Sequence, residues 1–183
     1  MIEIVKEVFN YLKNPVMDED ENTDLTYRLS LFFKLLVISL ITGFVISPIF
    51  GMLEILELIN LENHAAEQMM KNMTKFQILA FGVILAPFFE ELIFRAPITL
   101  FKNPKYFKIV FYVFAVLFGF VHITNFELTK NVLLLSPLLV LPQILLGSYL
   151  GFIRVKFGLH WSMFLHASYN GILIGISFFV DVP

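Results

Sequence analysis

The chain of 183 residues contains five apolar stretches, each close to the length of a transmembrane helix. They cover residues 29–53, 76–101, 107–124, 132–153 and 159–180. About 20 apolar residues are needed to cross the hydrocarbon core of a bilayer. Hydrophobic residues make up 58% of the sequence and charged residues 15%, which leaves too little polar surface to cover a soluble globule. The sequence therefore predicts an all-α, polytopic helical membrane protein with about five transmembrane helices.

Residues 1–28 differ from the rest of the chain. Apolar side chains recur there at helical spacing, at Ile4, Val5, Val8, Phe9 and Leu12. This spacing predicts a short amphipathic helix that lies in the membrane interface. An acidic stretch follows, with Asp18, Glu19, Asp20, Glu21 and Asp24, and it is typical of a solvated linker. We therefore divide the chain into this helix with its linker, residues 1–28, and a transmembrane helical domain, residues 29–183.

The basic residues are distributed unevenly between the two sides of the predicted bundle. With the N-terminus in the cytoplasm, the cytoplasmic side holds nine of them, Lys6, Lys13, Arg28, Lys34, Lys102, Lys105, Lys108, Arg154 and Lys156. The other side holds three, Lys71, Lys75 and Lys130, and Arg95 lies inside a span. Because basic residues gather on the cytoplasmic side of membrane proteins, we expect a multi-pass protein of the cell membrane with a cytoplasmic N-terminus.

The overall charge and the cysteine content exclude several classes of function. A net charge of -2 gives no basic surface that could neutralise phosphates, so nucleic acid is not an expected partner. The chain has no cysteine, which excludes disulfides, thiolate nucleophiles and cysteine-ligated zinc. Any catalysis therefore depends on Glu, Asp, His, Ser or Lys side chains, and the lipid bilayer is an expected partner.

Several polar side chains interrupt the apolar spans at membrane depth. They are Glu90, Glu91, Arg95, His122, His166 and Asn170. Ionisable groups are costly at this depth and are a functional hypothesis by default, although a structural ion pair is the simpler alternative. The i,i+4 spacing of Glu91 and Arg95 allows such a pair, whereas Glu90 is turned about 100° away on the helix and needs a partner from another helix. Glu91 and Arg95 are therefore expected to be positioning residues.

Depth in the membrane brings the remaining polar residues together. Counted from the cytoplasmic loop that each span meets, Glu90, His122, His166 and Asn170 lie about 12–21 Å deep at 1.5 Å per residue. His166 and Asn170 also share one helix face, because they are i,i+4. Two small-residue spacings, Gly147 to Gly151 and Gly171 to Gly175, would let helices approach closely, or are incidental. We therefore expect three helices to build one polar layer.

Other candidate residues carry less weight. His64 lies in the polar segment between the first two spans, beside Glu62 and Glu67, and is expected to be solvated. The serines of the last span, Ser162, Ser168 and Ser177, have no base at a suitable spacing. A serine protease is therefore not predicted.

Three motifs carry a resemblance to a known family. They are E-E-L-I-F-R at residues 90–95, F-G-F-V-H at residues 118–122 and H-A-S-Y-N at residues 166–170. They resemble the E-E-x-x-x-R, F-x-x-x-H and H-x-x-x-N motifs of the CAAX protease and bacteriocin-processing family of intramembrane proteases, in the order of that family. The resemblance covers residues 76–176, the expected protease-like core. Ala96 is a departure, because members commonly have glycine after the arginine.

The resemblance implies hydrolysis of a peptide bond in a membrane-associated peptide or protein. Glu90 and His122 would then activate water, and His166 and Asn170 would donate hydrogen bonds to the oxyanion of the tetrahedral intermediate. Glu91 and Arg95 would position the helix.

Two alternatives stay open. Glu90, His122 and His166 are also ordinary zinc ligands, although the sequence lacks the H-E-x-x-H motif and a site without a metal cofactor is favoured. A non-catalytic membrane protein that binds a peptide, for instance in self-immunity to a bacteriocin, is the alternative to an enzyme. Retention of the complete set of polar residues favours the enzyme.

Overall fold

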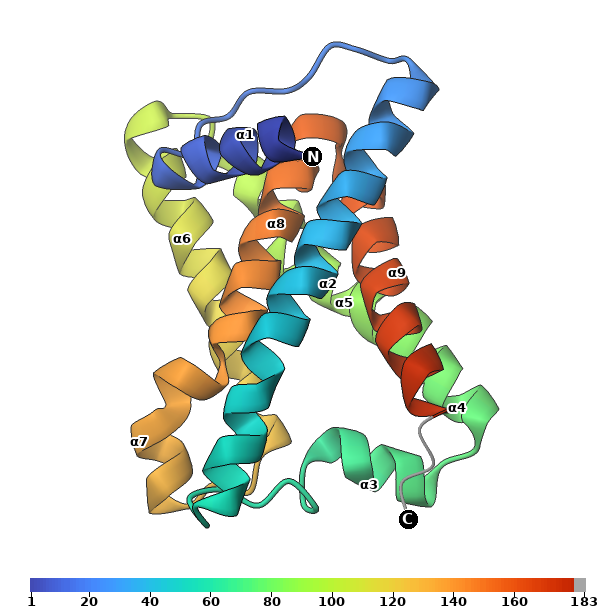
Figure 1. Ribbon diagram of the computed structural model, residues 1–183. Coiled ribbons are helices and arrows are strands. Elements are labelled where there is room, and N and C mark those ends of the chain that lie inside the picture. Colours follow the sequence, from blue (N-terminus) through green and yellow to red (C-terminus); the bar gives the residue numbers. More distant parts are fainter. Residues whose placement is uncertain (180–183) are drawn as a thin grey trace.

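The computed structural model describes residues 1–179 and consists of helices joined by short connections, with no strand among these residues (Figure 1). The helices are α1 (Ile2–Lys13), α2 (Leu25–Ile55), α3 (Ala65–Asn72), α4 (Lys75–Leu79), the π-helix η1 (Ala80–Leu85), α5 (Ala86–Phe94), the 3-10 helix η2 (Ala96–Leu100), α6 (Pro104–Val121), the 3-10 helix η3 (His122–Asn125), α7 (Lys130–Leu139), α8 (Leu141–Phe157) and α9 (Leu159–Ser177). The predicted all-α fold is confirmed. The expected end of the last span at Val180 and that of the transmembrane domain at Pro183 lie outside the described residues.

Within residues 1–179, four helical segments are long and apolar enough to cross a membrane, one fewer than expected. They are Leu25–Ile55, Lys75–Leu100, Lys105–Asn125 and Lys130–Phe157. The fifth expected span is α9, which has 19 residues and is long enough. It is not among the four because polar side chains such as His166 and Asn170 interrupt its apolar sequence. The protein is thus a polytopic helical membrane protein, and its last helix, α9, carries site residues.

Two of the four spans are irregular, which the sequence analysis did not predict. The span that was expected to be continuous from 132 to 153 is divided at Val140, where α7 ends and α8 begins. Pro142 lies in the first turn of α8. The N–H groups of a first turn have no partner within the helix, so a proline there removes no helical hydrogen bond. The second span passes through α4, η1 and α5, and its π-helical part η1 lies beside α9.

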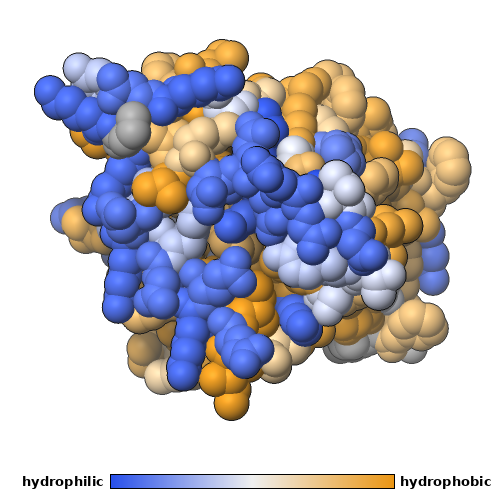
Figure 2. All heavy atoms as spheres, turned by 90° about the horizontal axis from the view of Figure 1, so that it is seen from above, coloured by the Kyte–Doolittle hydropathy of each residue, from blue (hydrophilic) through white to orange (hydrophobic). Residues whose placement is uncertain are grey.

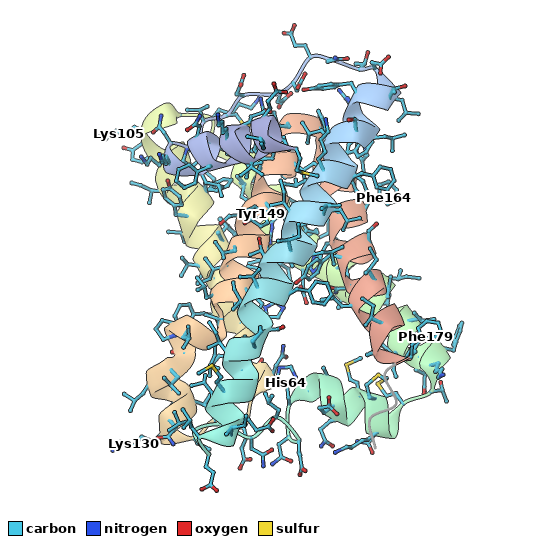
Figure 3. All side chains as sticks on the ribbon, in the orientation of Figure 1. His64, Lys105, Lys130, Tyr149, Phe164 and Phe179 are labelled. Atoms are coloured by element: carbon cyan, nitrogen blue, oxygen red, sulfur yellow. The ribbon has the colours of Figure 1, made fainter. Side chains whose placement is uncertain are left out.

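The end of the bundle that carries α1 is polar on its outside. Figure 1 shows α1 lying across this end, and Figure 2 shows hydrophilic residues gathered over the same face. Ile4 and Val8 of α1 are buried against the bundle, while Phe9 stays exposed. Lys105 and Lys130 lie at opposite ends of the molecule (Figure 3). The predicted first helix is thus present at one end of the bundle, and its position in the membrane interface stays a prediction.

The acidic linker is held more firmly than a merely solvated connection. The backbone N–H of Asp20 donates to the carbonyl of Lys156 at the end of α8, at 3.1 Å. The Tyr27 hydroxyl donates to the Asp20 carboxylate at 2.7 Å, and this hydrogen bond lowers the pKa of Asp20 below its usual range. Asp24 caps α2 by accepting from the Tyr27 backbone N–H. The linker therefore fixes the start of α2 against the end of α8.

The close contact between α6 and α8 depends on two glycines. A Cβ atom at Gly147 would lie 2.9 Å from the ring of Phe118, and one at Gly151 would lie 2.7 Å from the ring of Phe111. Gly175, by contrast, has no atom within 4 Å of such a position. Of the two small-residue spacings, the one at Gly147 and Gly151 thus brings helices together, and Gly175 plays no such part.

Candidate active site

Glu90 lies between two histidines from different helices. Its Oε2 atom is 3.9 Å from Nε2 of His122 and 3.7 Å from Nε2 of His166. Glu90 belongs to α5, His122 starts η3 directly after α6, and His166 belongs to α9. Three separate elements thus bring these side chains to one place. The side chains of Glu90 and His122 keep 25% and 18% of their surface exposed, so a small molecule can reach them.

Both histidines are oriented through Nδ1, the ring nitrogen that does not face Glu90. Nδ1 of His122 lies 2.7 Å from the carbonyl oxygen of Phe118, which can only accept a hydrogen bond. Nδ1 of His166 lies 3.0 Å from Oε1 of Glu91. If these Nδ1 atoms carry the protons, both Nε2 atoms are directed at Glu90 as lone pairs or, in the imidazolium form, as donors.

Glu91 and Arg95 form a buried ion pair beside the site. Oε1 of Glu91 lies 3.6 Å from Nε of Arg95, and the two side chains are 0% and 1% exposed. The guanidinium also lies over the ring of Phe118, with Cζ 3.9 Å from the centroid. The i,i+4 pairing agrees with the sequence analysis, which did not foresee that Glu91 also holds His166. Neither residue lines the cavity described below.

Asn170 is attached to the π-helix η1. Its Nδ2 atom donates to the carbonyl oxygen of Gly82 at 2.9 Å. The N–H of Ala86 bonds to Phe81 in the π-helical register, and the next residue, Pro87, has no N–H to offer to Gly82. Asn170 therefore satisfies a carbonyl that the proline leaves without a helical partner. One of its two amide protons is used in this way, and the side chain still lines the cavity.

The polar layer opens into a cavity of about 400 Å³. Its lining includes Glu90, His122, Gln143, His166 and Asn170, together with Met70 of α3 and the N-cap residue of that helix, His64. Helix α3 lies across the end of the bundle opposite α1 (Figure 1). The cavity is thus covered by α3 on that side and extends inward to the polar layer.

His64 is not simply solvated, contrary to expectation. It lies at the start of α3 (Figure 3), where its Nδ1 accepts a hydrogen bond from the backbone N–H of Ala66 at 3.2 Å. Its ring contacts that of Phe126, with centroids 4.7 Å apart. Burial lowers the pKa of His64, with nearby His122 acting in the same direction and Glu67 opposing it. The polar sequence around His64 concealed this burial, because the covering residues come from distant segments.

The same geometry tests whether the residues could hold a metal ion. Among residues 1–179, no three His, Asp or Glu side chains are grouped closely enough to do so. The Glu90 carboxylate approaches the two imidazoles at 3.7 and 3.9 Å, which is too long for a direct hydrogen bond. This spacing suits a water molecule between the three groups.

Comparison with known proteins adds one finding. A family model described as type II CAAX prenyl endopeptidase Rce1-like matches residues 72–172, and this range contains all three motifs. No curated protein and no solved structure was found to match the chain.

Proposed function

Because the chain belongs to the type II CAAX prenyl endopeptidase Rce1-like family, we propose that it is an intramembrane endopeptidase that uses water activated by Glu90 and His122. The substrate in this proposal is a membrane-associated peptide or protein. The single observation that carries the proposal is the position of Glu90 Oε2 between two imidazole Nε2 atoms, in a cavity within the helix bundle.

The proposed reaction needs no group beyond those of the site and a water. Glu90 takes a proton from the water while the hydroxide oxygen forms a bond to the carbonyl carbon of the peptide. The carbonyl oxygen becomes an oxyanion in the tetrahedral intermediate. Breaking the C–N bond releases the amine, which takes the proton from Glu90, and leaves a carboxylic acid. Atoms and charge balance, and Glu90 returns to its starting form.

The neighbouring residues have distinct roles in this proposal. His122 shares the water with Glu90 and is held in place by the Phe118 carbonyl. His166 donates from Nε2 to the oxyanion, while its Nδ1 is held by the Glu91 carboxylate at 3.0 Å. Asn170 donates with its second amide proton. Glu91 and Arg95 act only as positioning residues, since they lie outside the cavity.

A cleavage assay tests the proposal. Protein purified in detergent is incubated with a peptide library, and the products are identified by mass spectrometry. We expect specific cleavage by the wild type and none by Glu90→Ala, whereas Glu62→Ala, an exposed glutamate outside the cavity, stays active. Peptide binding without cleavage by the wild type would instead support the non-catalytic peptide-binding or self-immunity alternative.

A second experiment concerns zinc. We propose that no metal is used, so activity survives exhaustive chelation and metal analysis of the active protein finds well below one equivalent. Zinc bound through Glu90, His122 and His166 would give the opposite result, because removal of a ligand would release the ion. Stoichiometric zinc that is lost in His122→Ala, with activity restored when zinc is returned to chelated wild type, would overturn the metal-free mechanism.

The membrane orientation is a further part of the proposal. We infer that α9 crosses as a fifth span in the cell membrane, because its polar residues His166 and Asn170 line the cavity and need not meet lipid. With the N-terminus in the cytoplasm, the C-terminus is then outside, as the distribution of basic residues favours. A reporter fused after Pro183 should be active only outside the cytoplasm, and cytoplasmic activity would contradict five spans.

A further inference from the structure

Gln143 is a cavity residue with an acceptor atom that nothing in the described part of the chain satisfies. In residues 1–179, buried side-chain atoms without a hydrogen-bond partner occur in Glu91, Arg95 and Gln143. The first two are paired as ions. The third, Oε1 of Gln143, has no such explanation, and the residue lines the same cavity as Glu90 and His122.

The break between α7 and α8 places Gln143 near the polar layer. It lies in the first turn of α8, directly after the break at Val140. Gly119 of α6, three residues before His122, allows this turn to come close, since a Cβ atom there would lie 3.2 Å from both the N atom of Ile144 and the O atom of Val140. The turn that carries Gln143 thus packs against the end of the helix that leads into His122.

Three other polar side chains of the cavity each have one atom engaged in a fixed contact. Nδ1 of His122 is bonded to the Phe118 carbonyl and Nδ1 of His166 to Glu91. Asn170 donates to Gly82. A buried acceptor without a partner costs free energy, so an apolar side chain would be more stable at position 143 unless something else bonds there.

We propose that Gln143 binds the main chain of the substrate, with Oε1 accepting a hydrogen bond from a peptide N–H beside the scissile bond. Peptide N–H groups that enter a membrane-embedded cavity lose their water and need protein acceptors. A carboxamide also carries donors, so it matches both polar groups of a peptide. This inference rests on the proposed function, because the proposed function makes the ligand a peptide. The hydrogen bond itself does not require that the peptide is cleaved.

A binding experiment tests this inference without requiring cleavage. The probe is the ten-residue peptide that immobilised Glu90→Gln protein in dodecylmaltoside retains most tightly from a synthetic library, and its affinity is measured by fluorescence anisotropy. In the Glu90→Gln background, Gln143→Met should weaken binding about tenfold, as expected for one lost hydrogen bond. Gln68→Met makes the same change at an exposed position outside the cavity and should have no effect.

A set of ester-containing probes locates the hydrogen bond and does not depend on the variant alone. Each probe replaces one peptide N–H by an ester oxygen. The ester at one position of the peptide should weaken binding about tenfold to the protein that retains Gln143. The same ester should not weaken binding further to the protein that carries Gln143→Met. If every ester weakens both proteins equally, or if Gln143→Met binds the parent peptide as tightly, the inference is wrong. Absence of cleavage by the wild type would refute the endopeptidase alone, because the binding measurements use a protein that lacks Glu90.

Discussion

The end of the helix bundle that carries α1 is densely packed, whereas the end covered by α3 encloses the cavity. At the first end, Phe107, Phe111 and Phe152 are almost completely buried, and Tyr11 of α1 contacts the last two rings at 5.7 and 5.0 Å. At the other end, the lining of the cavity reaches His64, the N-cap residue of α3. The bundle thus combines a rigid support with a hollow that can admit a ligand.

The boundary between these two regions passes between adjacent residues. Glu91 is fully buried, and its Oε1 atom is paired with Arg95 and His166. Glu90 faces the cavity and is one quarter exposed. Neighbouring carboxylates on one helix therefore belong to different regions, and substitutions at the two positions should separate catalysis from stability.

The largest effect is expected for Glu90→Gln. A carboxamide cannot take a proton from water, so turnover should fall by about 10²–10⁴-fold, the usual contribution of a general base. The thermal stability and the abundance of the protein should stay at wild-type values, because Glu90 is one quarter exposed and lies too far from both imidazoles, at 3.7 and 3.9 Å, for a direct hydrogen bond. Initial cleavage rates and thermal unfolding in detergent measure the two quantities. A parallel loss of stability would place Glu90 in the structural support.

Glu91→Gln should have the opposite pattern. It leaves the guanidinium of Arg95 buried without its counter-ion, which costs about 3–5 kcal/mol when one partner of a buried pair is removed. The abundance in membranes and the free energy of unfolding should both fall. The double variant Glu91→Gln/Arg95→Met removes both charges and should recover part of the loss. If Glu90→Gln and Glu91→Gln reduce abundance equally, the division of roles is wrong.

The contrast between the two glutamates was accessible from the sequence, because helix periodicity fixes which residues share a face. The i,i+4 spacing paired Glu91 with Arg95, and counting depth along the spans brought Glu90 to the level of His122 and His166. Both arguments use only regular helix geometry. The pairing of Glu91 with Arg95 follows from the regular turn of α5, whereas the depth count from Lys102 to Glu90 crosses the 3-10 helix η2, which the sequence did not predict.

The features that the sequence did not predict arise from tertiary contacts. The hydrogen bond from His166 to Glu91 joins residues 75 positions apart. The burial of His64 depends on how α3 folds back over the cavity, and the division at Val140 interrupts a run that is apolar on both sides. Hydropathy reports the environment of a segment but not its irregularities, so the turn that carries Gln143 could not be placed beforehand.

Glycine substitutions probe the dense region with a smaller effect. Gly147→Ala would bring a methyl group to 2.9 Å from Phe118 and 3.2 Å from Nη2 of Arg95, so the contact between α6 and α8 must open. Forcing extra volume into such a contact costs about 1–3 kcal/mol. Gly175→Ala is the matched control, because it meets no atom within 4 Å and removes a flexible residue from a helix. Unfolding in denaturant should show a loss for Gly147→Ala only, and equal effects would contradict close approach at this site.

The smallest effect concerns the cover of the cavity and its dependence on pH. The Nδ1 atom of His64 caps α3 only while it is unprotonated, and burial lowers the pKa of this group below its usual value of about 6.5. A base whose pKa is lowered by folding contributes its full stability above that usual value and loses it as the pH falls toward the lower, folded-state pKa. Amide hydrogen exchange in α3, corrected for intrinsic rates, should therefore accelerate between pH 7 and pH 5 more than exchange in α8. His64→Asn supplies a capping oxygen that does not titrate, so α3 should lose this extra dependence. The same acceleration in His64→Asn would show that the cover responds to another group and that the cavity opens independently of its cap.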